Sequence, residues 1–65
     1  MQKAIIKSKN NKGGERNGGR YWVEVEGKTV HRVFWHGNKG DNEASLKCQV
    51  FCRINNYDWD FEMPS

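Results

Sequence analysis

Two histidines and two cysteines are the side chains of this sequence best suited to bind a metal ion. His31 and His36 lie five positions apart, and Cys48 and Cys52 lie four apart, gaps similar to those found in zinc sites. Both pairs fall in segments predicted below to be strands, where residues an odd number apart face opposite ways and four residues cover about 13 Å. A disulfide needs Cα atoms within about 7 Å, so the cysteines cannot bridge there. We therefore predict no metal site, no cofactor and two reduced cysteines in the core.

Carboxylates near the end of the chain could act in hydrolysis or bind a divalent cation. Asp58, Asp60 and Glu62 alternate with apolar residues, which places them on one face of a predicted strand. Acid–base chemistry needs such groups in a shared cleft that separates their pKa values. An exposed terminal strand offers no cleft, and a charged face is typical of an edge protected from pairing with other chains. We therefore do not expect an enzyme.

The stretch KNNKGGERNGGR, residues 9–20, combines glycines with cations. Gly14 and Gly19 have the gap of a phosphate-binding loop, but Arg20 and Tyr21 replace its Lys and Ser/Thr. A strand follows instead of a helix, so no helix N-terminus is available for phosphates. Two interpretations stay open. The stretch is either a plain hairpin connection or a flexible basic loop that lies along a nucleic-acid backbone through Lys9, Lys12, Arg16 and Arg20.

Charge is spread unevenly along the chain. The formal net charge is +3, with +5 in residues 1–20, +1 in residues 21–56 and −3 in residues 57–65. A basic first segment is a typical footprint for polyanions such as nucleic acid. The alternative is a solvated arm that keeps the protein dispersed.

Alternation of apolar and polar residues predicts strands at both ends and in the middle of the chain. Residues 2–8 would point Ala4 and Ile6 inward, residues 21–26 follow the same period, and residues 57–63 form the clearest strand, ended by Pro64. Asn55 and Asn56 predict a turn before that last strand, because Asn tolerates left-handed backbone angles.

A tight hairpin is predicted around Glu26-Gly27-Lys28, followed by a strand over residues 29–36. The phase of this second arm changes partway along. A bulge would let Val30, Val33 and Trp35 all point inward.

Residues 44–54 are predicted to form a further strand after a turn-rich segment at 37–43. Strict alternation over this length is hard to reconcile with a helix, whose apolar face recurs every three to four residues. The predicted inner face holds Leu46, Cys48, Val50, Cys52 and Ile54, and the outer face holds Lys47, Gln49, Phe51 and Arg53.

Five short strands in 65 residues predict a single all-β domain over 1–65. We expect a small five-stranded antiparallel barrel of the SH3-like or OB-like type, since closure removes the strand edges. A dimerising antiparallel meander is the second possibility. A chain this short buries only about 60% of its unfolded surface, so most large apolar side chains should be inside. No stretch has the length of a membrane span or signal peptide, and a cytoplasmic location is expected.

Three aromatic rings, Trp22, Phe34 and Phe51, are predicted to point outward among cations. Exposed rings with nearby cations are typical of surfaces that stack the bases of single-stranded nucleic acid. The same rings could instead form a second small core, or anchor a protein partner.

The sequence thus predicts a non-catalytic binding module, most of all for nucleic acid and with a preference for single strands. The alternative is a small stand-alone adaptor or inhibitor that docks on a larger protein. Neither requires a membrane, and either is compatible with a monomer or a homodimer. The predicted contact residues are Lys7, Lys9, Lys12, Arg16, Arg20, Trp22, Arg32, Phe34, Lys47, Phe51 and Arg53.

Overall fold

The computed structural model describes residues 1–10, 18–36 and 40–62. They form a sheet with strand order β3-β2-β1-β4, in which β1 is antiparallel to β2, β2 is antiparallel to β3, and β4 is parallel to β1. The elements are β1 (Lys3–Asn10), β2 (Gly19–Val25), β3 (Lys28–Trp35), α1 (Gly40–Ile54) and β4 (Asp58–Phe61).

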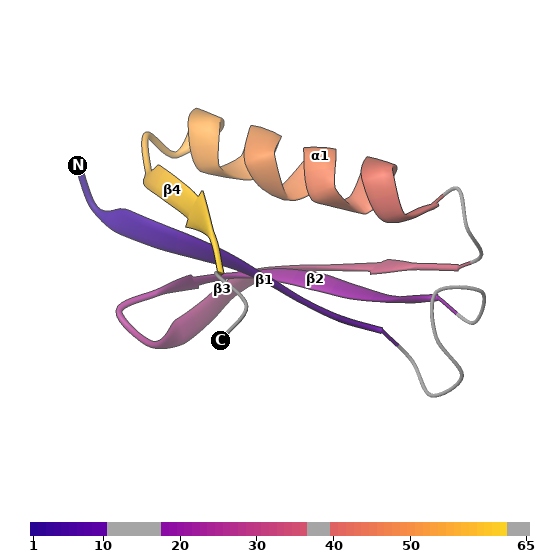
Figure 1. Ribbon diagram of the computed structural model, residues 1–65. Helices are drawn as coiled ribbons and strands as arrows, with labels where there is room; N and C mark the ends of the chain where they lie inside the picture. The colour runs from indigo at the N-terminus through magenta and orange to yellow at the C-terminus, as the bar shows by residue number, and fades with distance from the viewer. Residues whose placement is uncertain (11–17, 37–39, 63–65) are drawn as a thin grey trace.

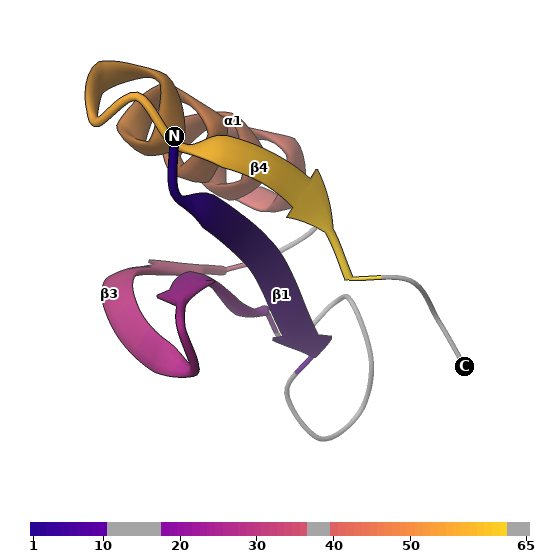
Figure 2. The ribbon, with the colours of Figure 1, turned by 90° about the vertical axis from the view of Figure 1, so that its left-hand side faces the viewer.

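Helix α1 lies across one face of this sheet, and in the described residues no element covers the other face (Figures 1 and 2). The pairings make β3 and β4 run in the same direction at opposite edges, so α1 is the crossover that joins them. A small β-rich fold is therefore confirmed. The sheet is mixed and open, however, and does not close into the predicted five-stranded barrel.

The strand predicted over residues 44–54 is wrong, because this segment belongs to α1. Ala44, Cys48 and Cys52 recur every four residues and are at most 2% exposed, as expected for the buried face of a helix. The same segment contains good helix formers, among them Glu43, Leu46 and Lys47. The position of Arg53 also favours a helix, because it lies in the last turn, where the helix dipole stabilises a cation.

Helix α1 ends where the sequence predicts a turn. Asn56 takes a left-handed φ of 58°. The N–H of Asn56 donates to the carbonyl of Arg53 at 3.2 Å, and the N–H of Tyr57 donates to the carbonyl of Cys52 at 2.9 Å. This pair of bonds is the Schellman arrangement that satisfies the last carbonyls of a helix.

The core lies between α1 and the sheet, and its central cluster is made of small and medium-sized side chains. Ala4 and Ile6 point into it from β1, as predicted, at 2% and 1% exposure. Val23 and Val25 join them from β2, facing the two cysteines of α1. Both cysteines are buried and free, although they lie on a helix instead of the predicted strand. Burial raises the pKa of Cys48 to about 11 and also raises that of Cys52.

Many larger apolar side chains lie outside the core, contrary to the expectation for so short a chain. The described residues with exposed large apolar side chains are Met1, Ile5, Val30, Phe34, Leu46, Val50, Ile54 and Phe61.

The hairpin between β2 and β3 and its bulge are confirmed. Glu26 and Gly27 both have positive φ, 54° and 80°, as a two-residue primed turn requires. The register shifts at Val23, which pairs with His31, while Glu24 pairs with Thr29. The extra residue is therefore residue 30. It is exposed and does not point inward as predicted, whereas Val33 and Trp35 pack inside.

The beginning of β2 is packed tightly. A side chain at Gly19 would collide with the carbonyl oxygen of Lys9 and would lie 2.9 Å from the ring of Trp35. The predicted loop over residues 9–20 is too long, because Lys9 and Asn10 belong to β1, Gly19 and Arg20 belong to β2, and the two strands pair from Asn10 and Gly19 onward. Residues 11–18 separate them in the sequence. Most of that segment lies outside the described residues.

Strand β4 completes the sheet beside β1 (Figure 2). Trp59 and the preceding Tyr57 pack against the core, as the alternation predicts. Phe61 is 43% exposed and meets Trp59 edge to face. The predicted continuation to residue 63 and the stop at Pro64 lie outside the described residues.

Candidate nucleic-acid interface

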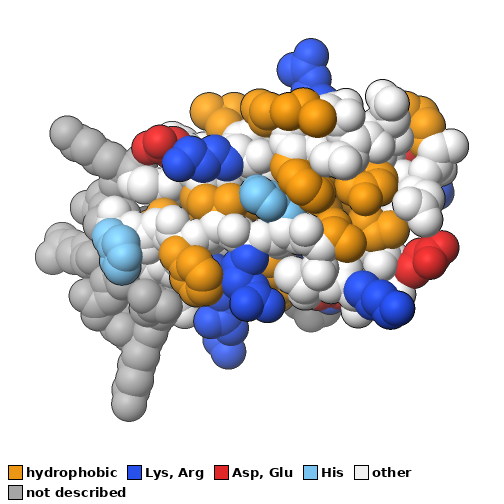
Figure 3. Space-filling model, turned by 180° about the vertical axis from the view of Figure 1, so that it is seen from behind, with side chains coloured by type: hydrophobic (Ala, Val, Ile, Leu, Met, Phe, Trp, Pro, Cys, Tyr) orange, Lys and Arg blue, Asp and Glu red, His pale blue; other side chains and the backbone are white. Residues whose placement is uncertain are grey.

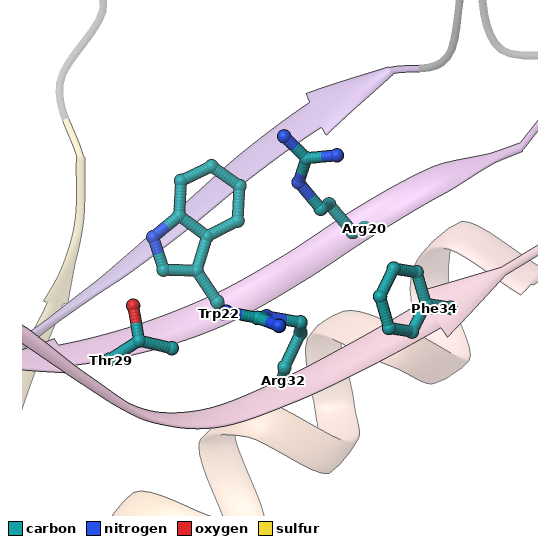
Figure 4. Close-up of a pocket in the computed structure, with 5 residues that line it drawn as sticks. All are labelled: Arg20, Trp22, Thr29, Arg32 and Phe34. Carbon is teal, nitrogen blue, oxygen red and sulfur yellow. The ribbon is translucent and has the colours of Figure 1, made fainter.

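The face of the sheet turned away from α1, called the open face below, brings four of the predicted contact residues together. In the cross-strand register Arg20 lies opposite Phe34, and Trp22 lies opposite Arg32. Two cations and two rings therefore alternate in a small grid across β2 and β3. These four residues, the open-face cluster, line a shallow pocket together with Thr29 (Figure 4).

The bulge in β3 is what places half of this cluster on the open face. Thr29 lies opposite Glu24 and His31 opposite Val23, so these two β3 residues point to opposite faces although they are two positions apart. In a regular strand, residues two apart share a face. The extra residue therefore turns Arg32 and Phe34 to the open face. Val33, which lies between them, packs against the core.

Trp22 is held in one orientation. Its indole Nε1 donates to Oε2 of Glu24 at 2.7 Å. The guanidinium carbon of Arg20 lies 5.5 Å from the centroid of the indole ring, within the range of a cation–π contact. One part of the Trp22 ring is therefore already occupied by the protein's own cation.

Lys7 lies beside Trp22 on β1 and is used internally. Its Nζ lies 3.3 Å from Oε1 of Glu24 and 3.3 Å from Oε2 of Glu62. These hydrogen bonds raise the pKa of Lys7. In turn, the Trp22 indole and, less strongly, Lys7 hold the pKa of Glu24 below its usual value. Lys7 is consequently a poor candidate for a contact with a phosphate.

Phe34 is the most accessible ring of the open-face cluster, with 64% of its surface exposed. It lies on edge strand β3, opposite Arg20, and Arg32 precedes it on the same face. Lys9 lies opposite Arg20 on β1 and extends the cationic area across a third strand. This corner of the open face joins three cations to one free ring.

Phe51 does not belong to this surface. It lies on α1, is half-buried, and packs against the core. Its ring stacks on His31 with centroids 4.2 Å apart and planes 6° apart, and it also meets Tyr57 at 6.1 Å. The prediction that Phe51 points outward is therefore wrong, because this ring packs against the main core between α1 and the sheet.

The remaining predicted contact residues are scattered. Lys47 and Arg53 lie on α1, and α1 covers the opposite face of the sheet from the cluster. Lys12 and Arg16 lie outside the described residues.

Glu24 and Thr29 are parts of this surface that the sequence prediction did not include. Glu24 shares the outward phase of Trp22, two positions away on the same strand, and that spacing is the signal that would have found it. Thr29 becomes a neighbour only through the hairpin register.

An acidic margin borders the open face. Asp58 pairs with Lys3 and Asp60 pairs with Ile5 across β1 and β4, and Glu62 follows on the same edge. In the described part of the chain, no three side chains of metal-binding type are close enough to hold an ion. In the same residues, no helix has the length and apolar content that a membrane crossing requires.

Comparison with models of protein families, with curated proteins and with solved structures found no match to this chain.

Proposed function

We propose that this chain binds nucleic acid through the open face of its sheet and performs no chemistry of its own. The observation that supports this is the cross-strand alternation of Arg20 with Phe34 and of Trp22 with Arg32 on a face that α1 does not cover. Guanidinium groups contact phosphates and base edges, and rings contact bases, so the cluster offers both kinds of contact side by side.

The cations divide into those available to a ligand and those already paired. Arg32 and Lys9 are exposed, and Arg20 lies over Trp22 with its charge free for a phosphate. Lys7 is held by two carboxylates. The acidic margin on β4 repels phosphates, so the bound strand is expected to follow β2 and β3 and to avoid β4.

The number of free rings bears on the form of nucleic acid. Single strands bind to a series of rings on which successive bases stack. With Phe51 in the core and Trp22 partly covered, Phe34 is the most accessible ring of the cluster. We therefore expect the two arginines to contribute more to binding than they would on a surface that binds single strands by stacking successive bases. A sheet surface of two strands fits the major groove of duplex DNA, so we expect duplex to bind at least as tightly as single strands.

The test is the Arg20→Gln/Arg32→Gln double variant, measured by fluorescence anisotropy with labelled single-stranded and duplex oligonucleotides over a salt series. We expect affinity to fall by about tenfold or more. The slope of log affinity against log salt should become shallower by about 0.7–0.9 for each phosphate contact removed.

The matched control is Lys28→Gln/Lys47→Gln, which removes the same charge away from the open face. Lys28 lies opposite the core residue Val25, and Lys47 lies on α1. Equal losses in the two double variants would show that only net charge matters and would refute the proposed site. Absence of binding to any oligonucleotide at low salt would refute the function.

A protein partner is the second candidate, supported by a different feature. Strand β3 is an edge strand of eight residues, and Phe34 projects from it with 64% exposure. Such an edge can extend a partner's sheet while the ring fills a pocket. Affinity purification with and without nuclease separates the two candidates: a protein that remains bound after nuclease treatment supports the adaptor or inhibitor.

A further inference from the structure

The outer side of α1 carries an apolar stripe that no part of the described chain covers. Leu46, Val50 and Ile54 are four residues apart and are 57%, 49% and 75% exposed. Figure 3 shows hydrophobic side chains gathered along this side of the molecule, over the helix. Single exposed apolar residues are ordinary, but a continuous row on one helix face marks a contact surface.

The charges at the two ends of this stripe are opposite. Glu43 lies one turn before Leu46 and also pairs with Lys47 of its own helix at 3.5 Å. Arg53 lies one turn after Val50, directly before Ile54. When a second copy of α1 is laid antiparallel with Leu46 opposite Val50 of the other copy, Glu43 comes opposite Arg53. The two-fold symmetry of such a pair makes each of these contacts twice. A parallel pair would instead bring like charges together at both ends.

The edges of the sheet are less suited to a second copy. Two β4 edges paired antiparallel about Trp59 would bring Asp58 opposite Asp60 of the other copy. Two β3 edges paired about Val30 would bring Lys28 opposite Arg32. Like charges directly opposite each other destabilise strand pairing. Of α1 and the two edges of the described sheet, α1 is therefore the surface that is complementary to itself.

We propose that two copies of this chain associate through antiparallel α1 helices, with Leu46 and Val50 at the centre of the contact, ion pairs between Glu43 and Arg53 on either side of it, and Ile54 at its outer ends. The contact is small, so the dimer is weak and forms in the micromolar range, as interfaces below about 1,200 Å² do. Because α1 lies opposite the open face, the two open faces point away from each other. If the proposed function holds, a dimer can therefore join two nucleic-acid segments.

Sedimentation velocity over a concentration series tests the association without reference to nucleic acid. We expect Val50→Lys to raise the dimer dissociation constant by at least about tenfold, since it places two like charges at the centre of the contact. Phe34→Ala on the open face is the control and should leave the constant unchanged. Wild-type protein that stays monomeric up to about 1 mM would overturn the proposal.

A charge exchange tests the antiparallel register. Glu43→Arg alone and Arg53→Glu alone should each weaken the dimer, and the double variant should restore it. Residues 43 and 53 are ten positions apart on one helix, about 15 Å, so the rescue cannot arise within one copy. Failure of the double variant to recover association would contradict this arrangement. Circular dichroism checks that each variant keeps its helix, because all four altered side chains lie on the surface.

Discussion

The face of the sheet under α1 and the open face are built by the same strands from different side chains. Under α1, Ile6 and Val23 meet two cysteines, and Phe51 of the helix stacks on His31 of β3 beside them. On the open face, Arg20 and Phe34 project from strands with no helix above them. One step along a strand thus separates a residue that stabilises the fold from one that is free to bind. Stability and recognition are therefore expected to respond to different substitutions.

The sharpest test of this separation uses two neighbours on β1. Ile6 is 1% exposed under α1, and Ile5 is 44% exposed on the open face. We expect Ile6→Ala to lower the free energy of unfolding by about 2–5 kcal/mol, because it removes buried methyl groups and leaves a cavity. Ile5→Ala should cost less than about 1 kcal/mol. Urea denaturation followed by circular dichroism measures both, and equal losses would mean that the open face is covered in solution.

Phe34 on the open face and Phe51 of α1 allow binding and stability to be compared for the two faces of the sheet. Phe34→Ala should weaken the binding of single-stranded nucleic acid by about 1–3 kcal/mol, the value of one stacked base, with little change in stability. Phe51→Ala should lower stability, since its ring packs between His31 and Tyr57, and should leave the intrinsic affinity of the folded protein unchanged. The two variants are compared by urea denaturation and by anisotropy. If Phe51→Ala reduces affinity as much as Phe34→Ala does, the two faces are not independent.

The strands and their facing could largely be predicted from the sequence. Ala4 and Ile6 point inward, and Trp22 and Phe34 lie on the outer face, because the period of two in a strand fixes the face of each residue. The turn at Glu26-Gly27 and the presence of a bulge also follow from residue type and phase. The phase change predicts the bulge in the correct arm of the hairpin, the one that forms β3. Whether the extra residue, Val30, faces the core depends on packing that the sequence does not display.

Helix α1 could not be recognised by alternation because it carries two apolar stripes. The buried stripe runs through Ala44, Cys48 and Cys52, and the exposed stripe begins two residues later at Leu46. Two residues of helix turn through about 200°, so the stripes lie on nearly opposite sides. Interleaved in the sequence, they produce a period of two. The ion pair of Glu43 with Lys47, four residues apart and 3.5 Å long, was the local sign of a helix.

The sequence predicts the candidate site only in part, because the period of two in the α1 segment is also the period of a strand. Cross-strand neighbours such as Trp22 and Arg32 follow from the hairpin, so their grouping is within reach of the sequence. The grouping of Phe51, Lys47 and Arg53 with them assumed that their segment was a strand of the same sheet. Once that segment is a helix, these side chains move to the other side of the molecule.

The acidic margin gives a smaller effect that tests how far the binding surface extends over the open face. Asp60→Asn removes a negative charge beside Ile5, and we expect nucleic-acid affinity to rise about two- to fivefold at low salt. Glu26→Gln changes the charge equally at the hairpin turn and should have a smaller effect. Anisotropy titrations compare the two. A loss of affinity in Asp60→Asn would place this carboxylate in the contact instead of at its border.

The smallest expected effect concerns the hydrogen bond from Trp22 to Glu24, which orients the Trp22 ring on the open face. The indole hydrogen bond, with Lys7, lowers the pKa of Glu24 below 4.5. Its contribution to stability is therefore present above pH 4.5 and is lost as the pH falls through the lowered pKa. We expect the urea midpoint of the wild type to approach that of Glu24→Gln as the pH falls from about 6 to about 3. All other carboxylates are common to both proteins, so the difference reports on Glu24 together with Glu62, which shares Lys7 with it. A constant difference would mean that Glu24 does not hold Trp22, and that the ring on the open face is oriented by Arg20 alone.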